Sequence, residues 1–99
     1  PITVAIQTFA CADTEALLLF GRVRPGVPWI SVSRVALRKL DMLDYAKLLS
    51  DLRAPPGNQL ETLRGNLAGA HSIRINRRWR VVFRWSKLGP TDVRIIDYH

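Results

Sequence analysis

The sequence predicts an α+β domain in which an N-terminal strand and two helices precede an antiparallel sheet of three or four strands. Two observations carry this prediction: apolar residues alternate with mostly polar ones along two segments of residues 71–85, and apolar residues recur at helical spacing over residues 31–52. Ninety-nine residues, 47% of them hydrophobic, suffice for one core and leave no room for a second. We therefore expect a single domain over residues 1–99.

The first two elements are predicted from short local patterns. Residues 2–9 are rich in β-branched side chains and partly alternate, which is typical of a strand. A short helix is expected over residues 14–20, because Asp13 is a suitable N-cap and Gly21 a suitable residue just past the end.

The long apolar stripe over residues 31–52 predicts the longest helix. Pro55-Pro56-Gly57-Asn58 then ends it and reverses the chain. Residues 60–63 favour a short strand, residues 64–69 a loop, and residues 93–96 a last strand.

The segment over residues 71–85 predicts a β-hairpin with two different faces. One face is apolar and the other carries Arg74, Arg80 and Arg84, because successive side chains of a strand point to opposite sides. Asn76-Arg77-Arg78 can form the turn, since Asn tolerates a positive φ. Trp79, Trp85 and His71 fall on the apolar side, where we expect packing.

The charge balance favours a polyanionic partner. The formal net charge is +7 with a sequence pI of about 10.8, and most of the cations are arginines. Arginine binds phosphate and carboxylate groups in a planar, bidentate manner. The alternative is that the arginines only solvate a sheet face and form surface ion pairs.

The cysteine and histidine content limits the chemistry. Cys11 is the only cysteine, which leaves no disulfide framework or thiolate zinc site and makes a reducing, cytoplasmic setting the default expectation. The longest apolar run, residues 16–20, is too short to span a bilayer. No phosphate-binding loop, dinucleotide motif or HExxH occurs, so we expect no cofactor and no metal site.

The remaining inventory of arginine with a terminal histidine, tyrosine and aspartate fits the cleavage of RNA. RNA carries its own nucleophile, the 2′-hydroxyl, so that a protein needs to align it, stabilise charge on the phosphate and move protons. Arginines suit the second task, and Asp97, Tyr98 or His99 could serve the third.

Three sequence blocks resemble one protein family. They are Pro55-Pro56-Gly57-Asn58 with Leu63-Arg64-Gly65, the segment from His71 to Trp85, and the terminal Asp97-Tyr98-His99. Together they are similar to the HigB branch of the RelE/ParE toxin superfamily. The resemblance implies a RelE-like, microbial-RNase-like fold and an mRNA endoribonuclease toxin that acts on the ribosome. It also implies a helix-turn-helix antitoxin as partner, with operator DNA bound only through the antitoxin complex.

The resemblance also implies roles for individual residues. Arg80 matches the arginine that contacts the scissile phosphate, Arg64 the basic residue of a Leu-Lys-Gly motif, and Asp97, Tyr98 and His99 the catalytic tail. Apart from the resemblance, the cationic hairpin makes Arg74, Arg77, Arg78 and Arg84 candidate RNA contacts.

Two departures from the family pattern leave other functions open. Some members carry histidine where Glu61 stands, and a basic residue is usual where Leu67 stands. A toxin with weakened catalysis that acts mainly in a regulatory antitoxin complex is therefore one alternative. The other is a non-enzymatic inhibitor of DNA gyrase, because the ParE-type toxins share the fold.

Overall fold

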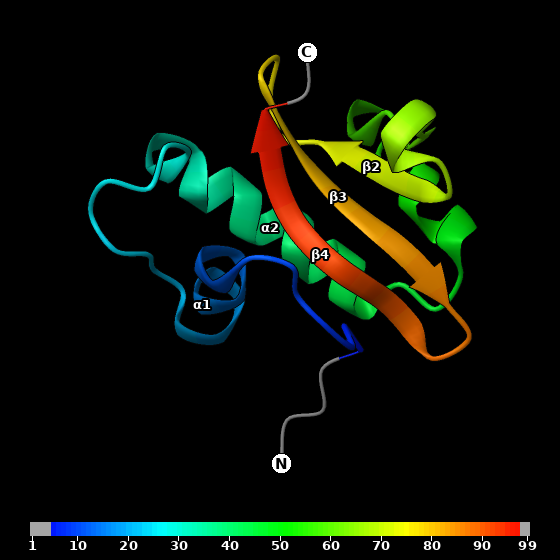
Figure 1. The fold of residues 1–99 in the computed structure, drawn as a ribbon, viewed down its shortest axis with the longest axis horizontal. Coiled ribbons are helices and arrows are strands. Elements are labelled where there is room, and N and C mark those ends of the chain that lie inside the picture. Colours follow the sequence, from blue (N-terminus) through cyan, green and yellow to red (C-terminus); the bar gives the residue numbers. More distant parts are fainter. Residues whose placement is uncertain (1–4, 98–99) are drawn as a thin grey trace.

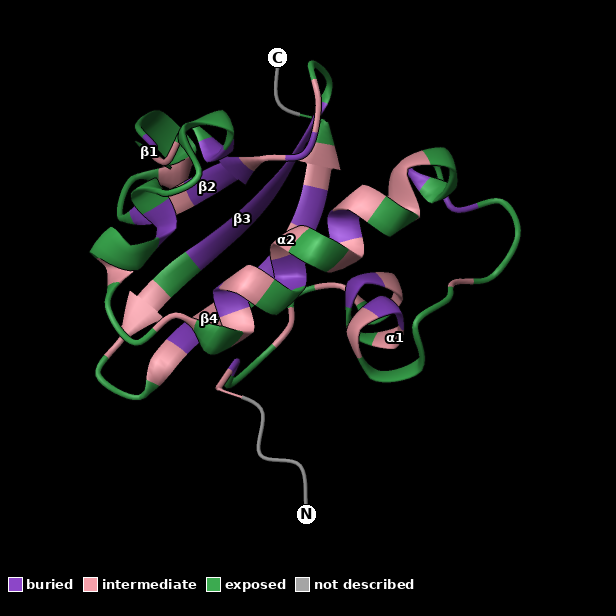
Figure 2. Cartoon of the chain, turned by 180° about the vertical axis from the view of Figure 1, so that it is seen from behind, coloured by how far each residue is buried: buried purple, intermediate pink, exposed green. Residues whose placement is uncertain are grey.

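A four-stranded antiparallel sheet forms the centre of the molecule. The computed structural model describes residues 5–97. The strands are β1 (Glu61–Thr62), β2 (Ala70–Arg74), β3 (Trp79–Ser86) and β4 (Gly89–Asp97), and they are neighbours in chain order. Two α-helices precede them, α1 (Ala12–Phe20) and α2 (Ser33–Tyr45). Helix α2 lies behind the sheet in Figure 1 and in front of it in Figure 2. The predicted α+β class is confirmed.

The predicted N-terminal strand is wrong for the residues that the structure describes. Residues 5–8 follow β4 without forming a strand, and Phe9 makes only an isolated parallel bridge to Val93. The reason lies in a side chain, because the backbone N–H groups of Ala5 and Ile6 donate to a carboxylate oxygen of Asp44 at 2.7 and 3.1 Å. The remainder of the predicted strand, residues 2–4, lies outside the described residues.

Helix α1 ends where the sequence predicts and begins earlier. Gly21 adopts a left-handed conformation, with φ of 74°, and its N–H donates to the carbonyl of Leu17 at 2.9 Å. Asp13 lies within the first turn instead of capping it, since the helix starts after Cys11. The Asp13 carboxylate pairs instead with Arg24, at 3.0 Å from Nε.

The predicted helix over residues 31–52 is interrupted after Tyr45. Ala46 is extended, and a 3-10 helix follows at Leu49–Arg53. The Asp51 carboxylate accepts the backbone N–H groups of Lys47 and Leu48, both at 3.0 Å, and so caps the second segment. These two backbone donors also hold the pKa of Asp51 below its usual value.

The sheet has apolar contacts on both faces. Val81, Phe83 and Ile73 pack against α1 and α2 in the main core. The opposite face carries a smaller cluster made of Leu63, Ala70 and Val82, with Leu67 and Ile96 packed against it. Strand β3 is accordingly buried along most of its length (Figure 2).

The predicted hairpin is confirmed, but the reason given for its turn is not. Strands β2 and β3 pair antiparallel with Arg74 opposite Arg80. Within residues 5–97, only Gln59 and Asp92 have a positive φ among non-glycine residues. Asn76 instead stabilises the turn with its side-chain oxygen, which accepts the N–H groups of Arg78 and Trp79 at 2.9 and 2.8 Å.

Candidate functional site

Arg80 is a charged side chain held almost out of solvent on the sheet. It is 8% exposed. Its Nε donates to the hydroxyl of Ser72 at 2.7 Å, and its Nη2 donates to the carbonyl of Gln59 at 2.6 Å. The Glu61 carboxylate lies 3.6 Å from the same Nη2. These contacts fix the guanidinium plane. The Arg80 side chain therefore loses little conformational entropy when it binds an anion.

The turn that supplies the Gln59 carbonyl is held by Asn58. Asn58 is completely buried, and its Nδ2 donates to the carbonyls of Leu52 and Ala54 at 3.1 and 3.2 Å. Its side-chain oxygen accepts a hydrogen bond from Lys39 of α2 at 2.6 Å. The Pro-Pro-Gly-Asn block therefore has a structural task, since it places an acceptor beside Arg80.

Lys39 sits in a cationic environment. Partial burial, and then the positive charges of Arg38 and Arg74, lower the pKa of Lys39.

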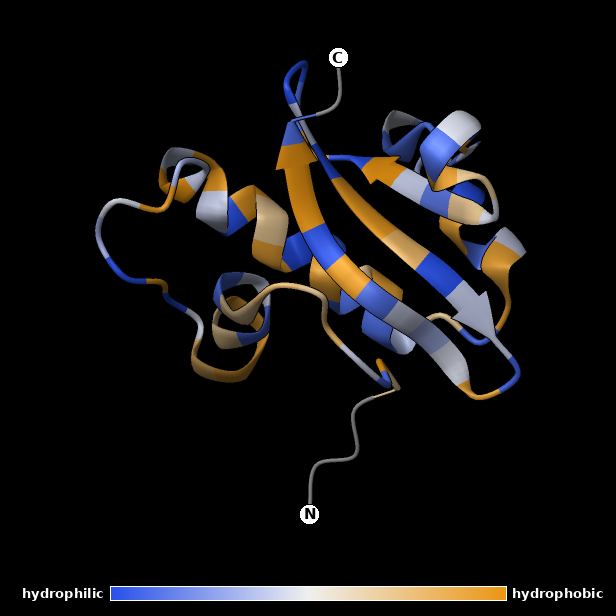
Figure 3. Ribbon diagram, in the orientation of Figure 1, coloured by the Kyte–Doolittle hydropathy of each residue, from blue (hydrophilic) through white to orange (hydrophobic). Residues whose placement is uncertain are grey.

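Four arginines share the sheet face opposite α2. Residues directly opposite each other in a ladder point to the same side, and the register pairs Arg74 with Arg80 and Val82 with Arg94. Alternation along β3 adds Arg84. We call Arg74, Arg80, Arg84 and Arg94 the arginine face; the blue bands on β3 and β4 in Figure 3 include parts of it.

Sequence reasoning missed four residues that belong to the arginine face or support Arg80. Arg94 could have been found by pairing the last strand with the hairpin, but its register depends on the bulge between Val82 and Arg84. Ser72 was visible on the polar side of the alternation. Asn58 and Gln59 belong to a recognised block whose role only the fold reveals.

Arg84 and Arg78 are less buried than Arg80. Arg84 is exposed and donates from Nη1 to the carbonyl of Ala68 at 3.2 Å. Arg78 is exposed at the hairpin turn, where its Nε donates to Asp97 at 2.8 Å and its guanidinium lies 4.8 Å from the centre of the Trp79 ring. The ion pair with Asp97 and the cation–π contact with Trp79 thus account for the position of the Arg78 side chain without an RNA ligand.

Of the other predicted catalytic residues, the structure describes only Asp97 and Arg64. Asp97 ends β4 opposite Trp79, so its side chain belongs to the face that points away from Arg80. Tyr98 and His99 lie outside the described residues. Arg64 is exposed after β1, where its carbonyl accepts the N–H of Leu67 at 3.2 Å, and Arg77 is exposed in the hairpin turn.

His71 lies on the apolar side, as expected. Its ring centre is 6.0 Å from that of Phe83, and its Nδ1 is 3.1 Å from the hydroxyl of Thr62. Burial lowers the pKa of His71, because an apolar setting disfavours the charged imidazolium.

In residues 5–97, no three histidine, cysteine or acidic side chains group closely enough to hold a metal ion. None of the helices described is both long and apolar enough to cross a membrane.

Fold and site together define a small α+β domain with a cationic sheet face, a class of protein suited to a polyanionic ligand. A family model described as the RelE-like toxin of the type II toxin-antitoxin system HigB matches residues 27–99. The chain belongs to this family of toxins.

Two relatives are similar over part of their length. Toxin HigB-1 of Vibrio cholerae serotype O1 is 51% identical over 55 residues, which cover 56% of this chain and 58% of the relative. An uncharacterized protein of Haemophilus influenzae is 38% identical over 52 residues, which cover 52% of each chain. The chain thus spans little more than half the length of the curated relatives it matches.

Proposed function

We propose that this toxin is an endoribonuclease that cuts ribosome-bound mRNA and thereby inhibits translation. Membership of the HigB family, whose model matches residues 27–99, supports the proposal. The observation that carries it is Arg80, a nearly buried cation that is held by Ser72 and Gln59 on the sheet face opposite α2.

The proposed reaction uses the RNA 2′-hydroxyl as nucleophile and requires no metal ion. The 2′-oxygen forms a bond to phosphorus, the bond from phosphorus to the 5′-oxygen breaks, and the products are a 2′,3′-cyclic phosphate and a 5′-hydroxyl. One proton leaves the 2′-oxygen for a base, and another reaches the 5′-oxygen from an acid. Arg80 stabilises the charge on the phosphate oxygens.

The remaining catalytic roles follow the family resemblance, and the RNA contacts follow from the positive charge of the hairpin. His99, Tyr98 and Asp97 are proposed to move protons, and Arg64 to add a second cation. Arg74, Arg77, Arg78 and Arg84 are proposed to contact the RNA backbone. Glu61 has a further role in this proposal, since its carboxylate near Arg80 balances the guanidinium charge before RNA binds.

The proposed partners are the ribosome with its mRNA and a helix-turn-helix antitoxin, in the cytoplasm. Operator DNA would be bound only through the antitoxin complex. A net charge of +7 favours both ribosomal RNA and an acidic protein segment.

Induced expression without an antitoxin tests the proposal. We expect growth arrest, loss of translation and mRNA ends that map inside reading frames. Arg80→Ala should lower cleavage by about 10²–10³-fold, as does the loss of a comparable charge-stabilising group. Arg34→Ala is the matched control, because Arg34 is exposed on α2.

The same experiment separates the alternatives. DNA damage with intact mRNA would contradict the proposal and support gyrase inhibition. Normal growth without cleavage would support a toxin that acts mainly in a regulatory complex.

A further inference from the structure

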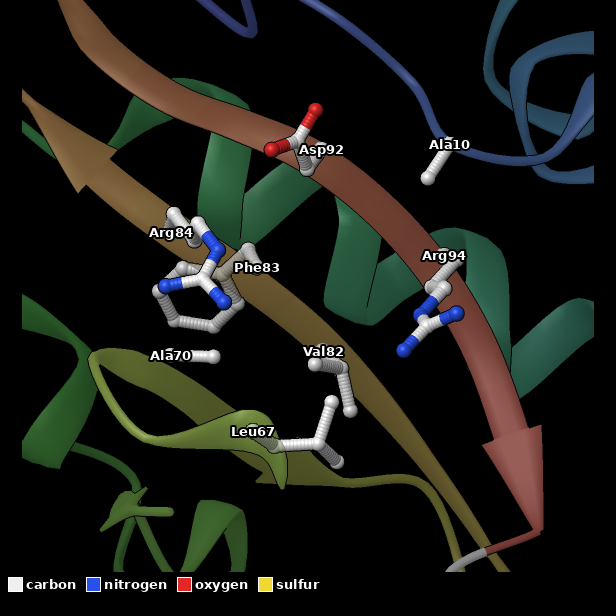
Figure 4. Close-up of a pocket in the computed structure, with 8 residues that line it drawn as sticks. All are labelled: Ala10, Leu67, Ala70, Val82, Phe83, Arg84, Asp92 and Arg94. Atoms are coloured by element: carbon white, nitrogen blue, oxygen red, sulfur yellow. The ribbon is translucent and has the colours of Figure 1, made fainter. Parts of the chain in front are cut away.

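A cavity of about 210 Å³ opens on the arginine face, beyond Val82 as seen from Arg80. Leu67, Ala70 and Val82 form its apolar floor, and Arg84, Arg94 and Asp92 provide its polar groups. Figure 4 shows the guanidinium groups of Arg84 and Arg94 on two sides of the space, with Val82 and Leu67 between them.

We propose that this cavity binds one unstacked nucleobase of the RNA, next to the site of cleavage. The inference rests on the proposed function, which it extends by assigning a base-binding subsite. Arginine guanidinium planes are common stacking platforms for splayed RNA bases. The volume is many times the roughly 10–15 Å³ that one water molecule needs, so the cavity has room for a single base.

The chemistry of the lining favours a base over a phosphate. A phosphate would meet the apolar side chains of Leu67 and Val82 and the negative charge of Asp92. A flat base would instead cover the apolar floor and place its polar edge toward Arg94 and Asp92. An aspartate accepts hydrogen bonds from exocyclic amino groups of bases.

The two arginines are suited to this task by their surroundings. Within residues 5–97, neither Arg84 nor Arg94 forms an ion pair with a carboxylate. Arg84 is anchored at one end by its hydrogen bond to the Ala68 carbonyl. Gly69 allows this approach, because a Cβ at that position would lie 2.9 Å from Nη1 of Arg84.

The position also fits an RNA strand that reaches Arg80. Arg80 and Arg84 are four residues apart on β3, which corresponds to about 13 Å at roughly 3.3 Å per residue. Both side chains lie on one face, so a strand with its scissile phosphate at Arg80 would bring a neighbouring nucleotide to the cavity.

Binding to the isolated protein provides the first test. Nucleosides and inorganic phosphate, each at millimolar concentration, are added to protein labelled at the methyl groups of Leu67 and Val82. We expect at least one nucleoside to shift both resonances, and Arg94→Ala to abolish the shifts. Equal shifts with inorganic phosphate, or no shift with any nucleoside, would overturn the proposal.

Cleavage mapping provides the second test. Arg94→Ala should lower cleavage by about 5- to 150-fold, the range for losing one base contact, and should relax the base preference at one position near the cut. Asp92→Asn should alter that preference, while Arg34→Ala should change neither quantity.

The failures of the two proposals are distinguishable. If the unsubstituted toxin cuts no mRNA, the proposed function fails, whatever the nucleosides do. If the toxin cuts mRNA and Arg94→Ala retains both its rate and its base preference, only the base subsite is wrong.

Discussion

At the scale of single residues, the burial of Arg80 separates it from the other cations. Alternation in the sequence predicts that Arg74, Arg80 and Arg84 lie on one face, with nothing to distinguish them. The spacing shows to which side of the sheet a side chain points, but not how deeply it is buried. Depth comes from the turn around Gln59 and from Ser72, which the fold brings to Arg80 from 21 and 8 residues away in sequence. Family resemblance is what singles out Arg80 before the fold is known.

Ser72→Ala should weaken both stability and cleavage. The substitution removes the acceptor of the Arg80 Nε hydrogen bond in a buried setting, which costs about 1–3 kcal/mol in the free energy of unfolding. Urea unfolding measures this cost, with exposed Ser31→Ala as the control. A lower stability with an unchanged cleavage rate would confine Ser72 to a structural role.

His71 should make the fold less stable in weak acid. Because burial lowers its pKa in the folded state, the unfolded chain binds the proton first, and stability is lost as pH falls below the unfolded value of about 6.5. The urea midpoint of the natural chain should therefore fall more between pH 7.5 and 5.5 than that of His71→Gln. Equal falls for both proteins would contradict this origin.

At the scale of elements, signals within a few neighbouring residues predicted the structure better than those that depend on distant contacts. The end of α1 at Gly21 follows from a helix-ending glycine, and the hairpin strands follow from the alternation of apolar and polar residues. The interruption after Tyr45 does not, because the apolar stripe continues and the cap is supplied by Asp51. The N-terminal strand fails similarly, since Asp44 takes two of its backbone donors.

Asn58→Ala should disturb the turn that supports Arg80. The change leaves the buried carbonyl of Leu52 without its partner, which costs about 1–3 kcal/mol in the free energy of unfolding. It also removes the partner of the Ala54 carbonyl and of the Lys39 ammonium, which are only partly buried. We expect lower thermal stability together with reduced cleavage, because the Gln59 carbonyl belongs to the same turn.

Asn66→Ala is the matched control for Asn58→Ala, since Asn66 is exposed in the short 3-10 helix Gly65–Leu67. If both variants unfold at the same temperature as the natural chain, the role assigned to Asn58 is wrong.

At the scale of the whole molecule, the sheet order turns a dispersed set of cations into one surface. Composition predicts a polyanionic partner, but Arg94 joins the arginine face only through its pairing with β3. Part of the positive charge is neutralised by neighbouring carboxylates, as in the ion pair of Arg78 with Asp97. The surface opposite α2 is therefore the one expected to meet RNA.

Binding to ribosomes should depend strongly on salt. The logarithm of the binding constant falls linearly as the logarithm of the salt concentration rises. Each phosphate contact makes this slope steeper by about 0.7–0.9. Arg77→Ala should reduce the slope by about one contact if the hairpin turn reaches RNA, whereas Arg34→Ala should leave it unchanged. Sedimentation with ribosomes over a salt series measures both, and identical slopes would exclude Arg77 from the contact surface.

The most direct measurement is single-turnover cleavage of a ribosome-bound mRNA that carries a 2′-deoxynucleotide at the cut position. We expect the natural chain to cut the all-ribose mRNA to a 2′,3′-cyclic phosphate and to leave the deoxy mRNA intact. Arg80→Ala should cut the all-ribose mRNA about 10²–10³-fold more slowly. Equal cleavage of the two mRNAs, or an unchanged rate for Arg80→Ala, would contradict the proposed chemistry.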